Sequence, residues 1–339
     1  MADLLPSTAV APLLPASYQG LDETTASYAH AGLHGAANTQ RAYQSDLKQV
    51  ITWLGTKHPG TPLLPMTPAV LADYAASLAE SGKKLSTIHR RVAAINKAHE
   101  LAGLLPPKDA MLAVVLKGIN RKVGKTQRQA KAFTVARLKK TVASIDTSTL
   151  QGLRDRALLL IGFSGAFRRS ELVALDLEHF ELRDGALVVT LPRSKTNQEG
   201  NREEKALFYS PSPLTCPIRA FEAWRDKLNR TTGPVFVRLV GASKHSQPKL
   251  SERRLAGAAV NKLVQRYLDD TVNSRKPGDR SNRITAHSLR ASFVTEAVRT
   301  GQNTKSIMNQ TKHKSTAMVE RYQRNNDVIA DNAAQNIGL

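Results

Sequence analysis

The chain has 339 residues and carries 49 lysines and arginines against 28 acidic residues, giving a formal net charge of +21. So much charge of one sign repels itself within a compact protein, which indicates a polyanionic partner such as nucleic acid. A single cysteine argues against an internal disulfide framework, and the absence of apolar runs near the ~20 residues of a membrane span argues against a membrane protein.

The first third of the chain predicts a helical bundle. Residues 1–20 are rich in Ala, Pro, Leu and Ser without periodicity, so we expect a disordered N-terminus there. Over 21–123 the pattern indicates amphipathic helices that start at Asn38, at Thr67-Pro68, near residue 85 and near residue 111. Short connections containing Pro and Gly make this an all-α helical bundle.

The third predicted helix has a basic face opposite its apolar stripe. That face is either solvated or laid into the major groove of DNA, and the net charge favours the second interpretation. Residues 124–132 contain no acid and predict a basic linker that can cross a phosphate backbone. The predicted DNA contacts of this half are Arg41, Thr87, His89, Arg90, Arg91, Lys97, Arg121, Lys122 and Lys125.

Residues 133–339 predict a second domain of mixed structure. Thr134 is the predicted cap of a helix, and L-R-D-R-A-L-L-L-I-G-F-S-G forms a buried one. Around residues 180–191 apolar residues alternate with polar ones, which predicts two strands joined by a hairpin turn at Asp184-Gly185. Residues 205–209 predict a third strand. Helices return at 217–229 and 252–270 and dominate from 285 onward. We therefore expect an α+β domain with a small antiparallel sheet in a mainly α protein.

Several short motifs in this domain suit attack on a phosphodiester. The sequence T-A-H-S-L-R sets an imidazole and a guanidinium three residues apart, so that both leave one helix face, and K-H-K-S-T-A-M-V-E-R-Y adds a second imidazole and a phenol. Upstream, R-R-S-E and S-K-T add further charged groups. Each motif alone is weak evidence, but their order and spacing form one set: Arg168, Glu171, Lys195, His287, Arg290, His313 and Tyr322.

These motifs resemble those of the tyrosine recombinases (phage integrase family), in a layout nearest to the Cre-like members. R-R-S-E matches the family's R-x-S-E, S-K-T its β-hairpin lysine, H-S-L-R its H-x-x-R, and K-H-K-S…Y its G-H-x-S…Y box. N-T-Q-R-A-Y-Q-S-D-L and S-T-I-H-R-R are similar to the family's N-terminal domain, so the resemblance covers about residues 36–339. Lys312 stands in place of the usual glycine, and a second arginine, Arg169, follows Arg168; the register to Glu171 favours Arg168 as the phosphate ligand.

The resemblance implies a particular organisation on DNA. A SAM-like core-binding domain and a catalytic domain form a C-shaped clamp on double-stranded DNA, and four copies assemble on two target sites. Residues 326–339 predict a small apolar helix that either packs on its own domain or, as the resemblance implies, is exchanged with a neighbouring protomer. The N-terminal end of the helix predicted at 252–270 would read the major groove, through Arg253, Arg254 and Lys262. The sequence does not indicate whether accessory proteins take part.

The chemistry of strand exchange explains why these residue types occur. The guanidinium groups of Arg168 and Arg290 stay protonated and can each donate two hydrogen bonds to the non-bridging oxygens of the phosphate. Tyr322 attacks the phosphorus, with His287 as the candidate base and Lys195 as the acid for the leaving 5′ oxygen. His313 donates to a non-bridging oxygen and Glu171 orients a neighbour. The expected product is a 3′-phosphotyrosyl link, made without ATP, metal or another cofactor.

Two alternatives remain beside a site-specific recombinase. A type IB topoisomerase uses similar groups, but that family usually has lysine at the position of His287. A non-catalytic DNA-binding protein with a decayed site is disfavoured because every expected catalytic position is filled. We expect a bacterial, phage- or plasmid-encoded protein that acts in the cytoplasm, on the nucleoid.

Overall fold

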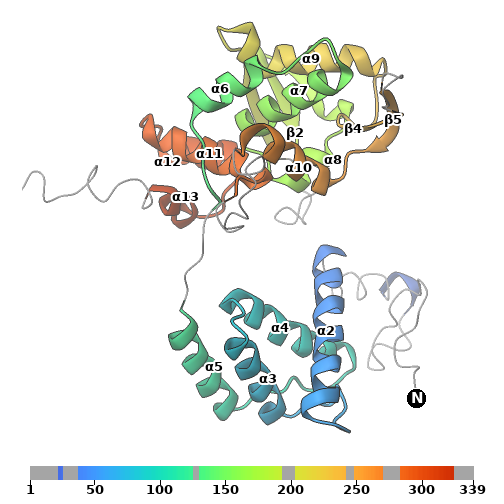
Figure 1. Ribbon diagram of the computed structural model, residues 1–339, viewed down its shortest axis with the longest axis vertical. Helices are drawn as coiled ribbons and strands as arrows, with labels where there is room; N and C mark the ends of the chain where they lie inside the picture. Colours follow the sequence, from blue (N-terminus) through green and yellow to red (C-terminus); the bar gives the residue numbers. More distant parts are fainter. Residues whose placement is uncertain are drawn as a thin grey trace, which may run out of the picture. The chain divides into compact units, whose positions relative to one another are not determined.

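The computed structural model describes residues 22–25, 37–124, 130–192, 203–241, 248–269 and 283–323, and the side chains of 37 and 321–323 are not described. The chain divides into two compact units, residues 1–127 and 128–339, which Figure 1 shows with their helices labelled. Four predicted features lie outside the described residues: the disordered segment 1–20, Lys125, Lys195 and the exchanged helix 326–339.

The described part of the first unit is a bundle of four helices, as predicted. They are α2 (Ala37–Lys57), α3 (Pro68–Glu80), α4 (Leu85–Leu101) and α5 (Ala110–Val123). The Thr67 side chain accepts a hydrogen bond from the Val70 amide and caps α3, with Pro68 in its first turn. The first helix begins one residue before the predicted cap, Asn38. Tyr74 and the aliphatic side chains around it fill the core.

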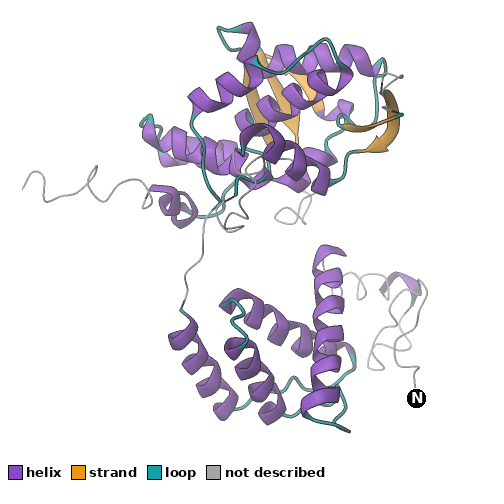
Figure 2. Cartoon of the chain, in the orientation of Figure 1, coloured by secondary structure: helices purple, strands orange, loops and turns teal. Residues whose placement is uncertain are grey.

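The second unit combines helices with two small sheets. Its helices are α6 (Val135–Ala143), α7 (Leu150–Ser164), α8 (Arg169–Ala174), α9 (Pro217–Leu228), α10 (Gly257–Leu268), α11 (Ala286–Arg299), α12 (Thr304–Thr311) and α13 (Thr316–Gln323). Its strands are β1 (Phe180–Arg183), β2 (Ala186–Thr190), β3 (Glu204–Phe208), β4 (Val237–Val240) and β5 (Lys249–Arg254). Figure 2 shows that the strands of the described chain belong to this unit. The expected class, mainly α with a small antiparallel sheet, is confirmed.

The three-stranded sheet has the order β1-β2-β3 and is antiparallel throughout. Asp184 and Gly185 both have positive φ, 52° and 74°, as a two-residue hairpin turn requires. The predicted hairpin and its third strand are therefore confirmed. The helix predicted from residue 252 is wrong at its start, because β5 pairs with β4 up to Arg254 and α10 begins only at Gly257.

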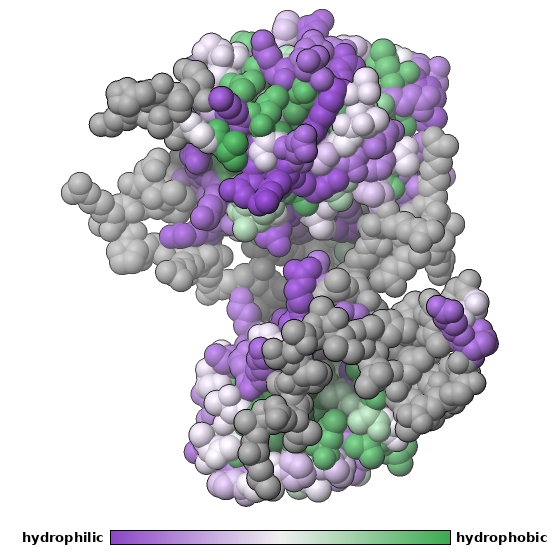
Figure 3. All heavy atoms as spheres, turned by 90° about the vertical axis from the view of Figure 1, so that its right-hand side faces the viewer, coloured by the Kyte–Doolittle hydropathy of each residue, from purple (hydrophilic) through white to green (hydrophobic). Residues whose placement is uncertain are grey.

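Buried side chains of the second unit form one large cluster and one small one. The large cluster is built on α7, whose residues Ala157 to Ile161 are buried, and includes Trp224 of α9. The small cluster joins α11, α12 and α13 through Val294, Ile307 and Val319. On the face that Figure 3 presents, hydrophilic side chains cover much of this unit, with smaller apolar patches between them. Within the described ranges, no helix is long and apolar enough to cross a membrane.

Candidate active site

The segment between α7 and α8 sets the first arginine of the site. After Gly165 the chain turns through Ala166, a non-glycine residue with φ 46°, and the buried Phe167. A Cβ atom added at Gly165 would lie 2.0 Å from the Phe167 ring, so the close turn requires glycine. Arg168 follows as the N-cap residue of α8.

Glu171 is the buried carboxylate behind Arg168. Its Oε2 accepts from the Arg168 backbone amide at 2.9 Å, and its Oε1 accepts from the Arg168 guanidinium. Burial raises the pKa of Glu171, but the charges of Lys205 and Arg168 and the hydrogen bonds from Arg168 outweigh it and leave the pKa below its ordinary value. Glu171 is therefore ionised and holds the Arg168 side chain.

Helix α11 carries the second arginine and an imidazole on one face. Arg290 is 1% exposed, and its Nη1 donates to the Ala166 carbonyl oxygen at 2.8 Å. His287 is exposed, but the protein around its ring removes part of its hydration and lowers its pKa, and the positive charges of Arg290 and Arg168 lower it further. At neutral pH the ring is therefore uncharged and able to take up a proton.

His313 follows α12 and is buried near the same charges. Burial lowers the pKa of His313 to about 3, with contributions from Arg290, Arg168, Lys205 and His287. Its Nδ1 lies 3.0 Å from the Thr311 hydroxyl oxygen, and that hydroxyl donates to the Ile307 carbonyl. The Thr311 proton is thus already used, so His313 donates from Nδ1 and its neutral form leaves Nε2 without a hydrogen.

The segment that precedes His313 is fixed by side-chain hydrogen bonds. Gln310 of α12 donates to the carbonyl oxygens of Ser164 at the end of α7 and Ala206 in β3, at 2.9 and 2.8 Å. Lys312, at the position where glycine is usual, has φ 55° in the left-handed region. Its Nζ donates to the Asn309 side chain at 3.1 Å.

The described residues thus bring together Arg168, Glu171, His287, Arg290 and His313 from three separated parts of the sequence. Tyr322 lies in α13 by its backbone, and α13 packs on α11 and α12. The Tyr322 side chain and the whole of Lys195 are outside the described part.

One residue of this region escaped the sequence prediction. Lys205 of β3 is 2% exposed, and its Nζ lies 3.6 Å from the Glu171 carboxylate. The signal was available, since strand residues alternate between faces and Lys205 is in phase with the buried Leu207.

The predicted DNA contacts that the structure describes differ in exposure, and one of them, Arg91, is buried. The exposed ones are Arg41, His89, Arg90, Arg121, Lys122, Arg253 and Lys262, and the half-buried ones are Thr87, Lys97 and Arg254. Several of them have partners within the chain: Arg90 pairs with Asp46 at 3.0 Å, His89 lies 3.0 Å from the Asn120 side chain, and Lys97 pairs with Glu100 at 3.1 Å.

Two of these predictions need correction. Arg91 is buried, donates to the Tyr74 hydroxyl at 3.0 Å and to the Gln49 side chain, and so belongs to the bundle interior. Arg254 lies on β5 rather than on a helix. Its guanidinium binds the carbonyl oxygens of Val173 and Leu175 and the Asp176 carboxylate, which makes it a structural link to α8.

A metal centre has no candidate among the residues that the structure describes, where no three His, Cys, Asp or Glu side chains gather as ligands.

Comparison with known proteins identifies the family of both units. Residues 131–328 match the phage integrase family, and residues 34–102 match the N-terminal SAM-like domain of phage integrases. An integrase/recombinase xerD homolog of Selenomonas ruminantium is 32% identical over 302 residues, covering 88% of this chain and 84% of that protein. Tyrosine recombinase XerD of Listeria monocytogenes serotype 4b (strain F2365) is 24% identical over 298 residues, covering 85% of this chain and 88% of that protein.

Solved structures share the fold at low sequence identity. The XerH site-specific recombinase bound to palindromic difH substrate, in a post-cleavage complex, gives a TM-score of 0.59 at 15% identity and covers 89% of this chain and 80% of that one. A lambda integrase(75-356) dimer bound to a COC′ core site gives 0.55 at 14% identity, covering 91% and 90%. The chain therefore belongs to the phage integrase family, as a tyrosine recombinase that performs site-specific DNA recombination.

Proposed function

We propose that the chain cuts and rejoins DNA at inverted-repeat sites through a 3′-phosphotyrosyl link to Tyr322. The observation that carries this proposal is the convergence of Arg168, Arg290, His287 and His313, whose charges act on one another's pKa values across α8, α11 and the end of α12. Such a cluster of cationic and imidazole groups suits a single phosphate. The similar XerH recombinase is bound to a palindromic substrate, which supports an inverted repeat as the target.

The two arginines stabilise the charge that develops during attack. Arg168 is held by Glu171, and Arg290 is held by the Ala166 carbonyl. Both guanidinium groups are therefore oriented before a substrate is bound. Donors fixed in this way cost no reorganisation during the reaction, and one such donor is worth about 3–4 kcal/mol of transition-state stabilisation.

The proton transfers balance without a further reagent. The Tyr322 oxygen forms a bond to phosphorus as the bond to the 5′ oxygen breaks; the phenol proton goes to His287, and Lys195 protonates the leaving oxygen. The low pKa of His287 keeps its ring uncharged and ready as a base. Because the phosphotyrosyl bond replaces a phosphodiester, the reverse attack by a 5′ hydroxyl needs no ATP.

His313 has a specific requirement as a donor to the phosphate. Its Nδ1 hydrogen is directed to Thr311, so donation to the substrate must come from a protonated Nε2. The pKa of about 3 applies without DNA. An anionic phosphate beside the ring favours the charged form and raises the pKa, so binding of DNA itself supplies the condition for donation.

DNA binding uses both units in this proposal, which hold one duplex as a C-shaped clamp joined by the basic linker 124–132. Exposed basic side chains on each unit, among them Arg41, Arg121 and Arg253, provide sequence-independent phosphate contacts. The chain acts in the cytoplasm, on nucleoid DNA.

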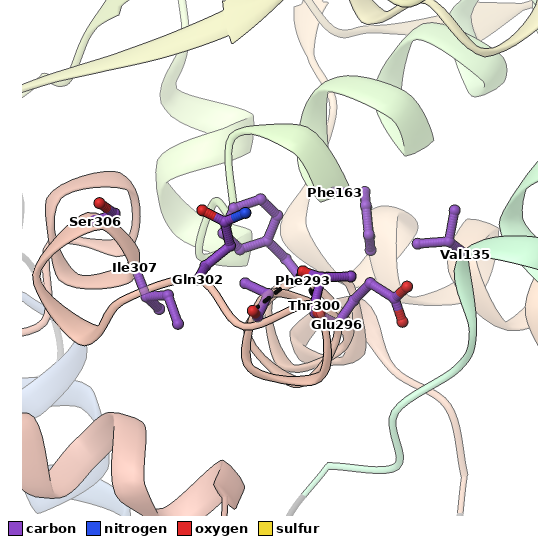
Figure 4. A pocket seen from close by; sticks show the side chains of 9 residues that line it. Val135, Phe163, Phe293, Glu296, Thr300, Gln302, Ser306 and Ile307 are labelled. Carbon is purple, nitrogen blue, oxygen red and sulfur yellow. Dashed lines mark hydrogen bonds between the residues drawn. The ribbon is translucent and has the colours of Figure 1, made fainter.

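Four copies assemble on two sites, and a pocket in the second unit supports this part of the proposal. The pocket has a volume of about 320 Å³, and apolar atoms dominate its lining. Figure 4 shows Phe163, Phe293 and Ile307 among its walls. We assign it to residues 326–339 of a second copy, whose apolar positions include Val328 and Ile337. Deleting 326–339 should leave half-site binding unchanged and abolish the tetramer on DNA; a tetramer that persists would refute the assignment.

The test of the main proposal begins with a target. Duplexes selected from a random library by the Tyr322→Phe protein define the site, and a substrate nicked next to the cleavage position traps the covalent complex. Wild-type protein should form the adduct, and Tyr322→Phe should bind the DNA without forming it. Tyr209→Phe is the matched control, since Tyr209 is an exposed tyrosine of the same unit and should retain full cleavage.

Two results would contradict the proposal. An adduct formed by Tyr322→Phe would assign the nucleophile to another residue. Relaxation of supercoiled plasmids that lack the selected site would favour a type IB topoisomerase activity.

A further inference from the structure

Lys205 is a buried cation directly behind the two arginines. Its Cα pairs with Val189 of β2, so the residue lies within the three-stranded sheet. Its Nζ donates to the carbonyl oxygens of Gly165 and Ala166 at 2.8 and 3.2 Å and lies 3.6 Å from Glu171 Oε2. The two carbonyl oxygens accept two of the three hydrogens of the ammonium group, and the Glu171 carboxylate is close enough to pair with its charge.

All three of these oxygens belong to the segments that hold the arginines. The carbonyl oxygen of Ala166 also accepts from Arg290 Nη1, so one oxygen joins Lys205 to the arginine of α11. Glu171 also accepts from the backbone and guanidinium of Arg168. Lys205 thus contacts the support of each arginine, and Ala166, with its left-handed φ of 46°, is held from two sides.

Stability alone is a poor reason for a charge in this position. Burial lowers the pKa of Lys205 to about 7, with Glu171 acting in the opposite direction and Arg290 and Arg168 adding to the decrease. The Phe167 ring, 4.6 Å from Nζ, offsets part of the lost hydration. Buried ion pairs are often replaceable by apolar residues with no loss of stability, so the lysine calls for another explanation.

We propose that Lys205 is a positioning residue for strand cleavage: it fixes the turn at residues 165–167 and the Glu171 carboxylate, so that Arg168 and Arg290 are set for the phosphate before DNA binds. Lys205 does not contact DNA and transfers no proton, which distinguishes it from Lys195. The inference rests on the proposed function, because the two arginines act on the scissile phosphate only if that reaction takes place.

The expected effect is on the rate of the chemical step. A displacement of about 1 Å in a catalytic group can lower a rate about 100-fold. Lys205→Met keeps an unbranched side chain as far as Cε and removes the ammonium. This variant should therefore form the Tyr322 adduct about 100-fold more slowly at saturating DNA, with unchanged affinity for the site. Lys227→Met, an exposed lysine of α9, is the matched control and should cleave as the wild type does.

Two modified substrates separate positioning from proton transfer. A methylphosphonate at the cleavage position removes the negative charge that the arginines neutralise, so the defect of Lys205→Met should shrink on it. A bridging 5′-phosphorothiolate provides a leaving group that needs no proton. It should rescue Lys195→Ala and leave Lys205→Met slow. In a double-mutant cycle, the effects of Lys205→Met and Arg290→Ala on the cleavage rate should be strongly non-additive, because Lys205 acts through the position of Arg290.

The outcomes decide between specific alternatives. Cleavage by Lys205→Met at the wild-type rate would overturn the inference, and rescue by the phosphorothiolate would make Lys205 a proton donor instead. If Lys205→Met does not fold, Lys205→Gln retains an uncharged donor and takes its place. If neither variant folds, the lysine serves the fold and the positioning role is refuted. Absence of an adduct with wild-type protein would instead refute the proposed function itself.

Discussion

Replacing Lys312 by glycine should stabilise the second unit. Lys312 ends α12 with φ 55°, a conformation that costs a side-chain-bearing residue about 1–2 kcal/mol. Glycine avoids that cost but loses about 0.5–1 kcal/mol through the freedom of the unfolded chain. The exposed hydrogen bond from Lys312 to the Asn309 amide oxygen at 3.1 Å contributes at most about 0.5 kcal/mol, the low end for a hydrogen bond in proteins. The net gain in free energy of unfolding is therefore about 0.5 kcal/mol.

The assay is thermal unfolding of the full-length chain, with the transition of the second unit followed by calorimetry. For a unit of this size 1 kcal/mol shifts Tm by about 2–4 °C, so Lys312→Gly should raise Tm by about 1–2 °C. Lys312→Ala is the control. It removes the same charge and hydrogen bond but keeps a Cβ atom at positive φ, so it should not raise Tm.

The comparison between the two variants tests the cause. If alanine raises Tm as much as glycine does, the change comes from removing the partly desolvated charge of Lys312, and the backbone argument is wrong. If glycine lowers Tm, the side chain of Lys312 contributes more than the exposed contact to Asn309 indicates.

Further predictions concern the buried Arg91 and His313. Arg91→Met removes the buried guanidinium that binds Tyr74 and Gln49 and leaves the buried Asp46 paired with Arg90 alone. It should destabilise the first unit by about 3 kcal/mol in urea unfolding while leaving the salt dependence of DNA binding unchanged. Arg41→Ala should leave the stability of the first unit unchanged and weaken the salt dependence of DNA binding, reducing the magnitude of the slope of log K against log salt by about 0.9. Equal slopes for Arg41→Ala and the wild type would show that Arg41 contacts no phosphate. His313 has a folded pKa of about 3, below its ordinary value, so the unfolded chain binds the extra proton and stability falls as the pH drops from about 6.5 towards 3. Between pH 6 and 4.5 the wild type should lose up to about 1.4 kcal/mol per pH unit more than His313→Asn, measured by chemical unfolding at each pH; parallel curves would mean that His313 is not held neutral.

Features that depend on neighbouring residues, such as helix caps and tight turns, were predicted correctly from the sequence. Thr134 caps α6 by accepting from the Arg137 amide, and Asp184-Gly185 forms its turn, because each depends on residues a few positions away. Periodicity likewise identified the bundle, although His99, which is buried and accepts from the Met66 amide, was not among the predicted core residues.

The errors came from partners distant in the sequence. Arg91 lies beside the apolar stripe of α4, and only the folded bundle shows that Tyr74, Gln49 and Asp46 surround its guanidinium. The residues of β5 have no strong strand pattern, and their pairing with β4 decides their conformation. The order of motifs predicted the five site residues that the described structure brings together. Lys205 lies outside these motifs: strand alternation indicates that it is buried, but only the fold shows its contacts with Ala166 and Glu171.

The small cluster of Val294, Ile307 and Val319 has a consequence for hydrogen exchange. Helix α13 contains Tyr322, and among its described side chains Val319 belongs to this cluster while none belongs to the large one built on α7. Few buried apolar contacts mean a low free energy of local opening, so α13 can detach while the rest of the unit stays folded. Its amides should exchange with solvent deuterium much faster than those of α7, so the proposed nucleophile would lie on a helix that opens more readily than the core of the unit.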